Sequence, residues 1–107
     1  MANSIPTRNH GESVVLRLDT AADDIVTGLV TIQCIVWEPV AVGDTLQIEN
    51  AKEEIKFIVT SRDIGTEANE HMPPVVIPFP LGFKIQGLSL GALGTSNVVN
   101  IFLGPNG

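Results

Sequence analysis

Two stretches with strand patterns, joined by a turn, constrain this chain more than any other feature. The first, Leu29–Trp37, is a run of β-branched and large apolar residues, and the second, Thr45–Glu49, alternates apolar and polar residues. The segment between them contains Pro39 and Gly43-Asp44, residues that favour turns. This pattern is typical of a sheet that is buried on one face for part of its length and nearly on both faces for the rest.

Further short segments carry strand patterns, with Gly, Pro or Asp turns between them: Ser13–Leu18, Glu54–Thr60, Val75–Pro80, Gly82–Leu90 and Asn97–Leu103. Pro78 and Pro80 cannot donate to a ladder, so their segment is expected to be an edge strand or an extended crossing segment. For Asp19–Gly28 we expect a polar loop with at most one helical turn, since Thr20 and Asp23 resemble a weak capping box. The sequence therefore predicts an all-β domain, a β-sandwich or jelly-roll-like barrel of seven to eight short strands with little or no helix.

The charges are few and unevenly placed along the 107 residues, a length that fits one domain. Charged residues make up 17% of the chain, below the usual figure of about 25%. All carboxylates lie between Glu12 and Glu70, and Lys84 is the one charged side chain from His71 onwards. We therefore expect the C-terminal third to lie in the core or against a partner. The net charge of −6 argues against nucleic acid as the main partner.

Cys34 is the only cysteine, so no intrachain disulfide can form and a secreted disulfide scaffold is excluded. Met1–Glu12 is polar and does not resemble a signal peptide. No apolar run approaches the roughly 20 residues that span a membrane. We expect a protein made in a reducing compartment, with no membrane partner.

Two segments outside the predicted strands are candidates for partner contacts. Residues 1–12 are expected to form an extended N-terminal arm before a β-sandwich domain of residues 13–107, with Ile5 as the arm's one large aliphatic residue. Either a neighbouring protein or the domain's own sheet could hold such an arm. Ser61–Pro74 is a long polar connection that Pro73 and Pro74 keep extended, and a loop of this length is functional, ordered by a partner or mobile.

The titratable residues do not form a catalytic or metal-binding pattern. Cys34 lies within an apolar strand, where a cysteine usually acts as a small hydrophobe rather than as a thiolate paired with His10 or His71. The histidines and the cysteine lack the paired short spacing of a zinc site. The acidic residues at positions 19, 23 and 24 lack the spacing and the glycine of a calcium loop. We expect no enzymatic activity, no cofactor and no metal.

Several strand and turn residues resemble small structural proteins of tailed bacteriophages. They are Trp37, Gly43-Asp44, Leu46-x-Ile48, Phe79-Pro80, Gly87-Leu88, Leu93 and the closing Val98-Val99-x-Ile101-Phe102-Leu103. The resemblance covers roughly residues 29 to 103, and the chain departs from it in Phe102, where a tyrosine is common, and in its long 61–74 connection. The resemblance implies a virion component without catalytic residues: a small β-sandwich on the head shell, as a decoration or cement protein.

The resemblance also implies the partners and the location. The partners would be the major capsid protein and neighbouring copies of the chain, in a trimer for example, with the protein made in the host cytoplasm and placed on the capsid surface of the virion. The expected partner-binding residues are Ile5, Pro6, Arg8, His10, His71, Pro73, Pro74 and Phe102. Two alternatives stay open: a tail or neck adaptor ring, and a small carbohydrate-binding module that uses Trp37 and the Asp19–Asp24 loop.

Overall fold

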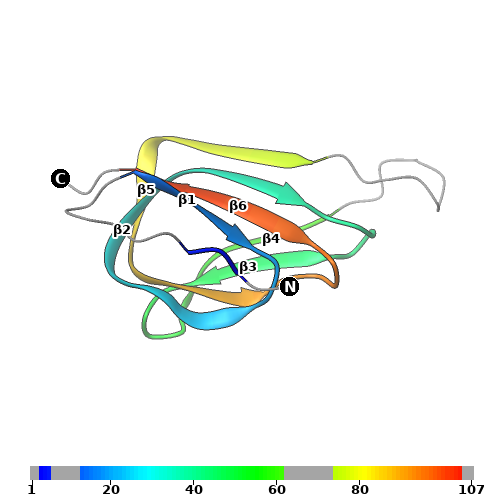
Figure 1. The fold of residues 1–107 in the computed structure, drawn as a ribbon, viewed down its shortest axis with the longest axis horizontal. Coiled ribbons are helices and arrows are strands. Elements are labelled where there is room, and N and C mark those ends of the chain that lie inside the picture. The colour runs from blue at the N-terminus through cyan, green and yellow to red at the C-terminus, as the bar shows by residue number, and fades with distance from the viewer. Residues whose placement is uncertain (1–2, 6–12, 62–73, 105–107) are drawn as a thin grey trace.

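Six antiparallel strands form one sheet in the computed structural model, which describes residues 3–5, 13–61 and 74–104 (Figure 1). The strands are β1 (Val14–Leu18), β2 (Ala22–Glu38), β3 (Thr45–Glu49), β4 (Ile55–Thr60), β5 (Val75–Ala92) and β6 (Val98–Leu103), and their order in the sheet is β1-β6-β2-β5-β3-β4. Within these residues there is no helix that could span a membrane. The all-β prediction is confirmed, with six strands in place of seven or eight.

The expected polar loop at Asp19–Gly28 is wrong, because β2 already begins at Ala22. The early part of β2 pairs with β5 through Ala22 opposite Leu90 and Val26 opposite Leu88, with register shifts between these pairs. Its polar side chains face solvent while the partner strand is buried. The polarity of this segment therefore reflects an exposed, irregular strand rather than a loop.

The two segments predicted as Val75–Pro80 and Gly82–Leu90 are one continuous strand, β5, that turns a corner. Gly82 has a φ of +78°, and a Cβ atom there would lie 2.7 Å from the Thr31 Cγ2 atom of β2. A glycine therefore lets the two long strands pass closely where both bend, at the same end of the molecule (Figure 1). Before this corner β5 pairs with β2 alone among the described residues, so the prediction of an edge strand is confirmed.

The bends curl the single sheet around one core in a sandwich-like arrangement. Leu16 of β1 and Leu46 of β3, from distant places in the strand order, belong to the same buried cluster. The cluster consists of Leu16, Leu18, Val30, Ile32, Ile35, Trp37, Leu46, Ile48, Ile85, Leu88, Leu90, Val99, Ile101 and Leu103. The almost uncharged C-terminal third supplies Ile85, Leu88, Leu90, Val99, Ile101 and Leu103 to it, so part of that segment lies in the core, one of the two places expected. Its described residues before Gly82 are largely exposed.

The start of the chain is tied to the domain's own sheet. The backbone of Ser4 exchanges hydrogen bonds of 2.8 and 3.1 Å with that of Arg17 in β1. The Asn3 side-chain oxygen accepts hydrogen bonds from the backbone N–H groups of Asp19 and Thr20. Residues 3–5 therefore follow the second of the two arrangements considered for the arm, and the rest of residues 1–12 lies outside the described part.

Candidate docking surface

The outer surface of β1, β6, β2 and the first part of β5 carries two rows of side chains that cross all four strands. In the first row Val15 pairs with Phe102, Phe102 with Cys34, and Cys34 with Pro78. Because opposite residues in a sheet share a face, these four side chains lie next to one another. In β1 and β6 these side chains alternate with buried residues, so they point away from the core, and Pro78 on β5 is exposed as well.

The second row lies beside the first and is half polar. Arg17 pairs with Asn100, Asn100 with Val36, and Val36 with Val76. We name the six apolar members of the two rows, Val15, Phe102, Cys34, Pro78, Val36 and Val76, the outer apolar face.

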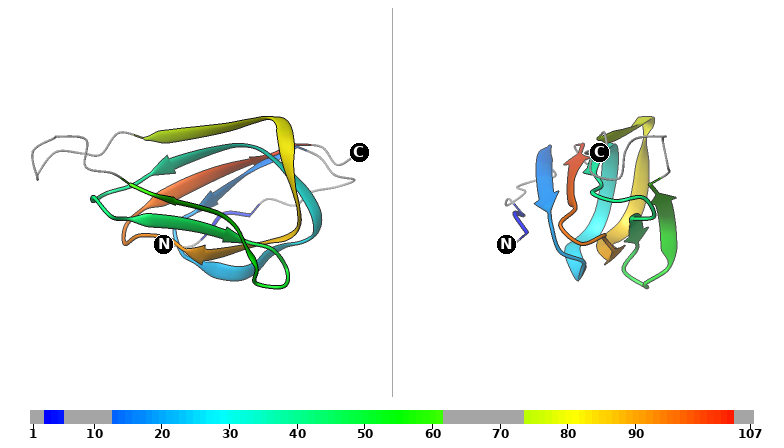
Figure 2. Two further views of the ribbon diagram at one scale, coloured as in Figure 1. Left: turned by 180° about the vertical axis from the view of Figure 1, so that it is seen from behind. Right: turned by 90° about the vertical axis from the view of Figure 1, so that its right-hand side faces the viewer.

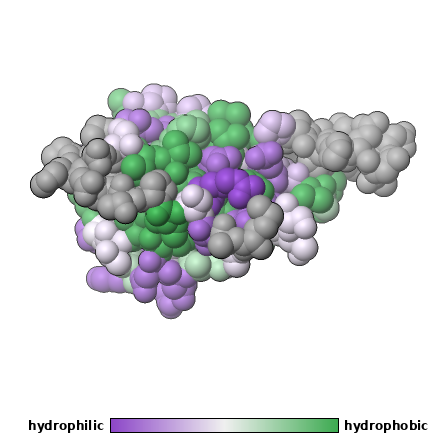
Figure 3. Space-filling model, in the orientation of Figure 1, coloured by the Kyte–Doolittle hydropathy of each residue, from purple (hydrophilic) through white to green (hydrophobic). Residues whose placement is uncertain are grey.

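Large hydrophobic side chains of the outer apolar face are open to solvent. Val15 is 44% exposed, Phe102 38% and Val76 60%, while Cys34 and Val36 are half-buried. Figure 3, which views the molecule with β1 and β6 in front, shows apolar side chains gathered over this side next to a hydrophilic group. A contiguous apolar patch bordered by polar residues is the usual mark of a protein-binding surface.

Three of the eight expected partner-binding residues lie in the described part of the chain. Phe102 is in the middle of the outer apolar face, Ile5 follows the Ser4 bridge at the edge of β1 and is exposed, and Pro74 is exposed just before β5. The structure thus places Ile5 next to β1 and Phe102 on β6, with β1 between the two segments, and Pro74 lies at the far end of the β2–β5 pairing. Pro6, Arg8, His10, His71 and Pro73 lie outside the described residues.

Five of the six members of the outer apolar face were not predicted as partner contacts. The alternation in Ser13–Leu18 already separates Val15 from Leu16 and Leu18. That signal identifies an outward side chain, but the strand order that places Val15 beside Phe102 depends on long-range pairing.

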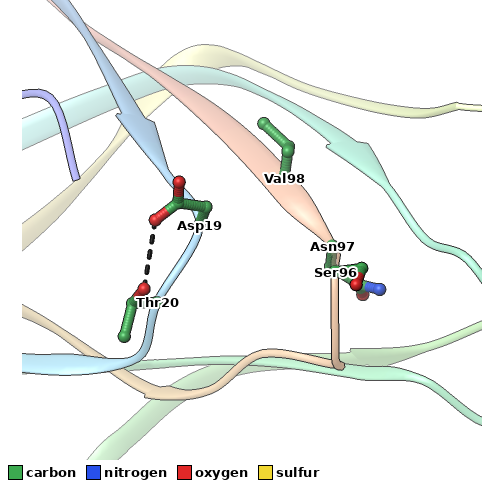
Figure 4. A pocket seen from close by; sticks show the side chains of 5 residues that line it. All are labelled: Asp19, Thr20, Ser96, Asn97 and Val98. Carbon is green, nitrogen blue, oxygen red and sulfur yellow. Dashed lines mark hydrogen bonds between the residues drawn. The ribbon is translucent and has the colours of Figure 1, made fainter. Parts of the chain in front are cut away.

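A shallow pocket of about 300 Å³ lies at one end of this half of the sheet, lined by Asp19, Thr20, Ser96, Asn97 and Val98 (Figure 4). One carboxylate oxygen of Asp19 accepts a hydrogen bond of 3.0 Å from the Thr20 hydroxyl, and the other lies 3.7 Å from an Arg17 guanidinium nitrogen. Asn97 points its amide toward Trp37 and Asp44. Asp19, Thr20 and Asn97 therefore have contacts within the fold, but the Asp19 oxygen next to Arg17 is buried and has no hydrogen-bond donor among the described residues.

Asp44 organises the turn before β3. Its carboxylate accepts hydrogen bonds from the backbone N–H groups of Val40 and Ala41 and from the Asn97 amide. Partial burial raises the pKa of Asp44, but the hydrogen bonds from Asn97, Ala41 and Val40 outweigh it and leave the pKa below its ordinary value.

The geometry limits two of the chemical roles considered for the sequence. Trp37 is fully buried and donates its indole N–H to Asn97, so its ring offers no surface on which a sugar could stack. In the segments that the structure describes, no group of three or more His, Cys, Asp or Glu side chains could hold a metal ion.

Comparisons with protein-family models, with curated proteins and with solved structures give no match. The outer apolar face is thus the feature from which a function is argued.

Proposed function

We propose that this protein is a non-enzymatic structural subunit that docks on other proteins through its outer apolar face. The observation that supports this proposal is the unbroken row from Val15 through Phe102 and Cys34 to Pro78, which crosses four strands on the solvent side. Burial of apolar area on docking contributes about 25 cal/mol for each Å² removed from water. The rigid ladder beneath the row keeps the ordering cost of binding low.

The partner that we propose is the head shell of a tailed bacteriophage, with this chain as its decoration or cement protein. The proposal rests on the resemblance of the strand and turn residues between positions 29 and 103 to small phage structural proteins. A contiguous apolar face on a small sandwich suits this role, because many copies on a symmetric shell multiply a modest contact.

Co-sedimentation with head shells tests the proposal. The probe is a purified shell of the major capsid protein from the phage that encodes this chain, assembled without the chain itself. The wild type is compared with the double variant Val15→Ser/Phe102→Ser, which removes two exposed apolar side chains from the outer apolar face. The matched control is Leu81→Ser, because Leu81 is 98% exposed on β5 but lies outside the two rows.

We expect saturable binding by the wild type and by Leu81→Ser, and at least a tenfold weaker binding (about 1.4 kcal/mol) by the double variant. Equal binding by all three proteins would place the contact elsewhere and overturn the docking surface. Absence of wild-type binding would overturn the shell as the partner, and a closed ring of wild-type subunits in light scattering would favour the adaptor alternative.

A further inference from the structure

Among the residues that the structure describes, several stretches of sheet edge have no pairing strand, and most of them carry features that hinder pairing with another strand. Ser4 already bonds to β1, two prolines interrupt the first part of β5, and the early part of β2 is broken by register shifts. These are the devices by which native sheets avoid edge-to-edge association.

β4 differs from the other edges. It lies at the opposite side of the sheet from β1 and pairs only with β3 among the described residues (Figure 2). From Phe57 to Thr60 it has no proline, no glycine, no charged residue and no register shift. The one shift in its pairing with β3 lies between Phe57 and Ile55, at Lys56, which is also its one charged residue. Ile58 is 55% exposed. Among the described residues, β4 is therefore a regular, apolar edge from Phe57 to Thr60, and its lysine and its register shift lie only at its start.

The pairing with β3 determines which backbone groups of β4 are directed outward. The Ser61 N–H donates to the Asp44 carbonyl, and Val59 and Phe57 occupy the equivalent positions opposite Leu46 and Ile48. Backbone groups alternate in direction along a strand. The N–H and C=O groups of Ile58 and Thr60, in the regular part of β4, are thus directed away from β3.

We propose that β4 pairs antiparallel with β4 of a second copy of this chain across a two-fold axis at Ile58. In this register Ile58 faces the partner subunit's Ile58, and Lys56 faces the partner subunit's Thr60. Ile58 then forms a hydrogen-bonded pair with its own copy, which gives about two hydrogen bonds at the axis, and Thr60 lies opposite the partner subunit's Lys56 on either side of it.

The side chains agree with this register on both surfaces of the sheet. On the inner surface Phe57 faces the partner's Val59. In each copy, Phe57 and Val59 are half-buried against the core. On the outer surface no two like charges face each other, because the charged Lys56 lies opposite a hydroxyl. Moving the two-fold axis from Ile58 to Lys56 would instead bring Lys56 opposite the partner subunit's Lys56. Like-charge repulsion disfavours that register.

The self-pairing does not depend on the proposed docking to a head shell, since β4 and β1 lie at opposite ends of the strand order. The two-fold axis closes the association at two copies. It predicts a dimer rather than the trimer that the resemblance to phage proteins implies.

Sedimentation equilibrium of the full chain over a wide range of concentrations tests the proposal. The wild type is expected to dimerise, and Ile58→Lys to weaken the dimer at least about tenfold by placing two like charges at the axis. Ile58→Pro removes an outward N–H that β3 does not use, so it should have a similar effect. The control Val76→Lys changes a side chain of the outer apolar face and should leave the dimer intact.

A mixture of Ile58→Lys and Ile58→Glu proteins provides the most specific readout. Each variant alone is expected to be monomeric, and the mixture should form a one-to-one dimer because opposite charges then meet at the axis. The emission of Trp37, the only tryptophan, checks that each variant is folded. A monomeric wild type, a dimer that tolerates both Ile58 substitutions, or oligomers that keep growing with concentration would each overturn the proposal.

Discussion

The indole nitrogen of Trp37 donates a hydrogen bond of 3.0 Å to the side-chain oxygen of Asn97, and both residues are fully buried. The Asn97 amide nitrogen donates in turn to Asp44 at 2.8 Å. One side chain thus joins the end of β2, the residue before β6 and the turn before β3. Since buried polar groups are costly unless they are paired, this network ties three chain segments into one arrangement.

The first prediction concerns Asn97. Asn97→Ala leaves the buried indole N–H of Trp37 without its acceptor and creates a small cavity, so we expect it to lower the free energy of unfolding by about 2–3 kcal/mol. Urea unfolding followed by Trp37 fluorescence measures the loss. The control Asn100→Ala, on the outer side of β6, should change stability by less than about 0.5 kcal/mol. Equal losses in the two variants would contradict the role of the network.

The second prediction concerns the pH dependence contributed by Asp44. The pKa of its carboxyl is lowered from an ordinary value of 3.8 because the hydrogen bonds from Asn97, Ala41 and Val40 outweigh the effect of burial. A group whose pKa is lowered by folding stabilises the protein above its unfolded pKa, and that stabilisation disappears as the pH falls through the folded pKa.

Asp44→Asn should therefore be less stable than the wild type near pH 7, and the difference should shrink as the pH falls below 3.8 toward the lowered pKa. Thermal unfolding of both proteins across this range measures the difference. Asp23→Ala serves as a control for the general effect of removing a carboxylate, because Asp23 is exposed. A difference between wild type and Asp44→Asn that stays constant with pH would refute the prediction.

The third prediction concerns Gly87 of β5. Its φ is +82°, and a Cβ atom there would lie 2.7 Å from the Ala51 Cβ atom and 3.0 Å from its backbone nitrogen. The Ala51 N–H donates to the Gln86 carbonyl at 2.9 Å, so the turn after β3 cannot retreat without losing this bond. Gly28 has a similar φ of +86°, but nothing lies within 4 Å of an added Cβ atom.

Gly87→Ala should accordingly cost about 1–2 kcal/mol more than Gly28→Ala, since both substitutions strain the backbone and only the first adds a clash. Denaturant unfolding of the two variants gives the comparison directly. If Gly28→Ala lowered stability as much as Gly87→Ala, backbone strain alone would account for both losses. The close approach of the turn to β5 would then not contribute to stability.

Strand positions with strict alternation could be predicted from the sequence. Thr45–Glu49 has the predicted bounds, and Phe102 lies on the opposite face of β6 from Val99 and Ile101, as expected. Local alternation records which side of a strand meets the core, so it survives without knowledge of the neighbours.

Two features could not be predicted because they depend on long-range pairing. The acidic residues at the start of β2 give that segment the sequence pattern of a polar loop. It is a strand because it pairs with Leu88 and Leu90 of β5, which the local sequence does not reveal. The outer apolar face needs the order β1-β6-β2-β5, which no periodicity contains. That the eight predicted residues, Phe102 among them, contact a partner stays a prediction.

The most direct test of docking through the outer apolar face is the reactivity of Cys34. It is the only cysteine, and it lies between Phe102 and Pro78 in the middle of the first row. The rate of alkylation by iodoacetamide is measured for the free protein and for the protein bound to head shells. We predict at least a tenfold slower reaction in the bound state, and an equal rate in both states would contradict docking through this face.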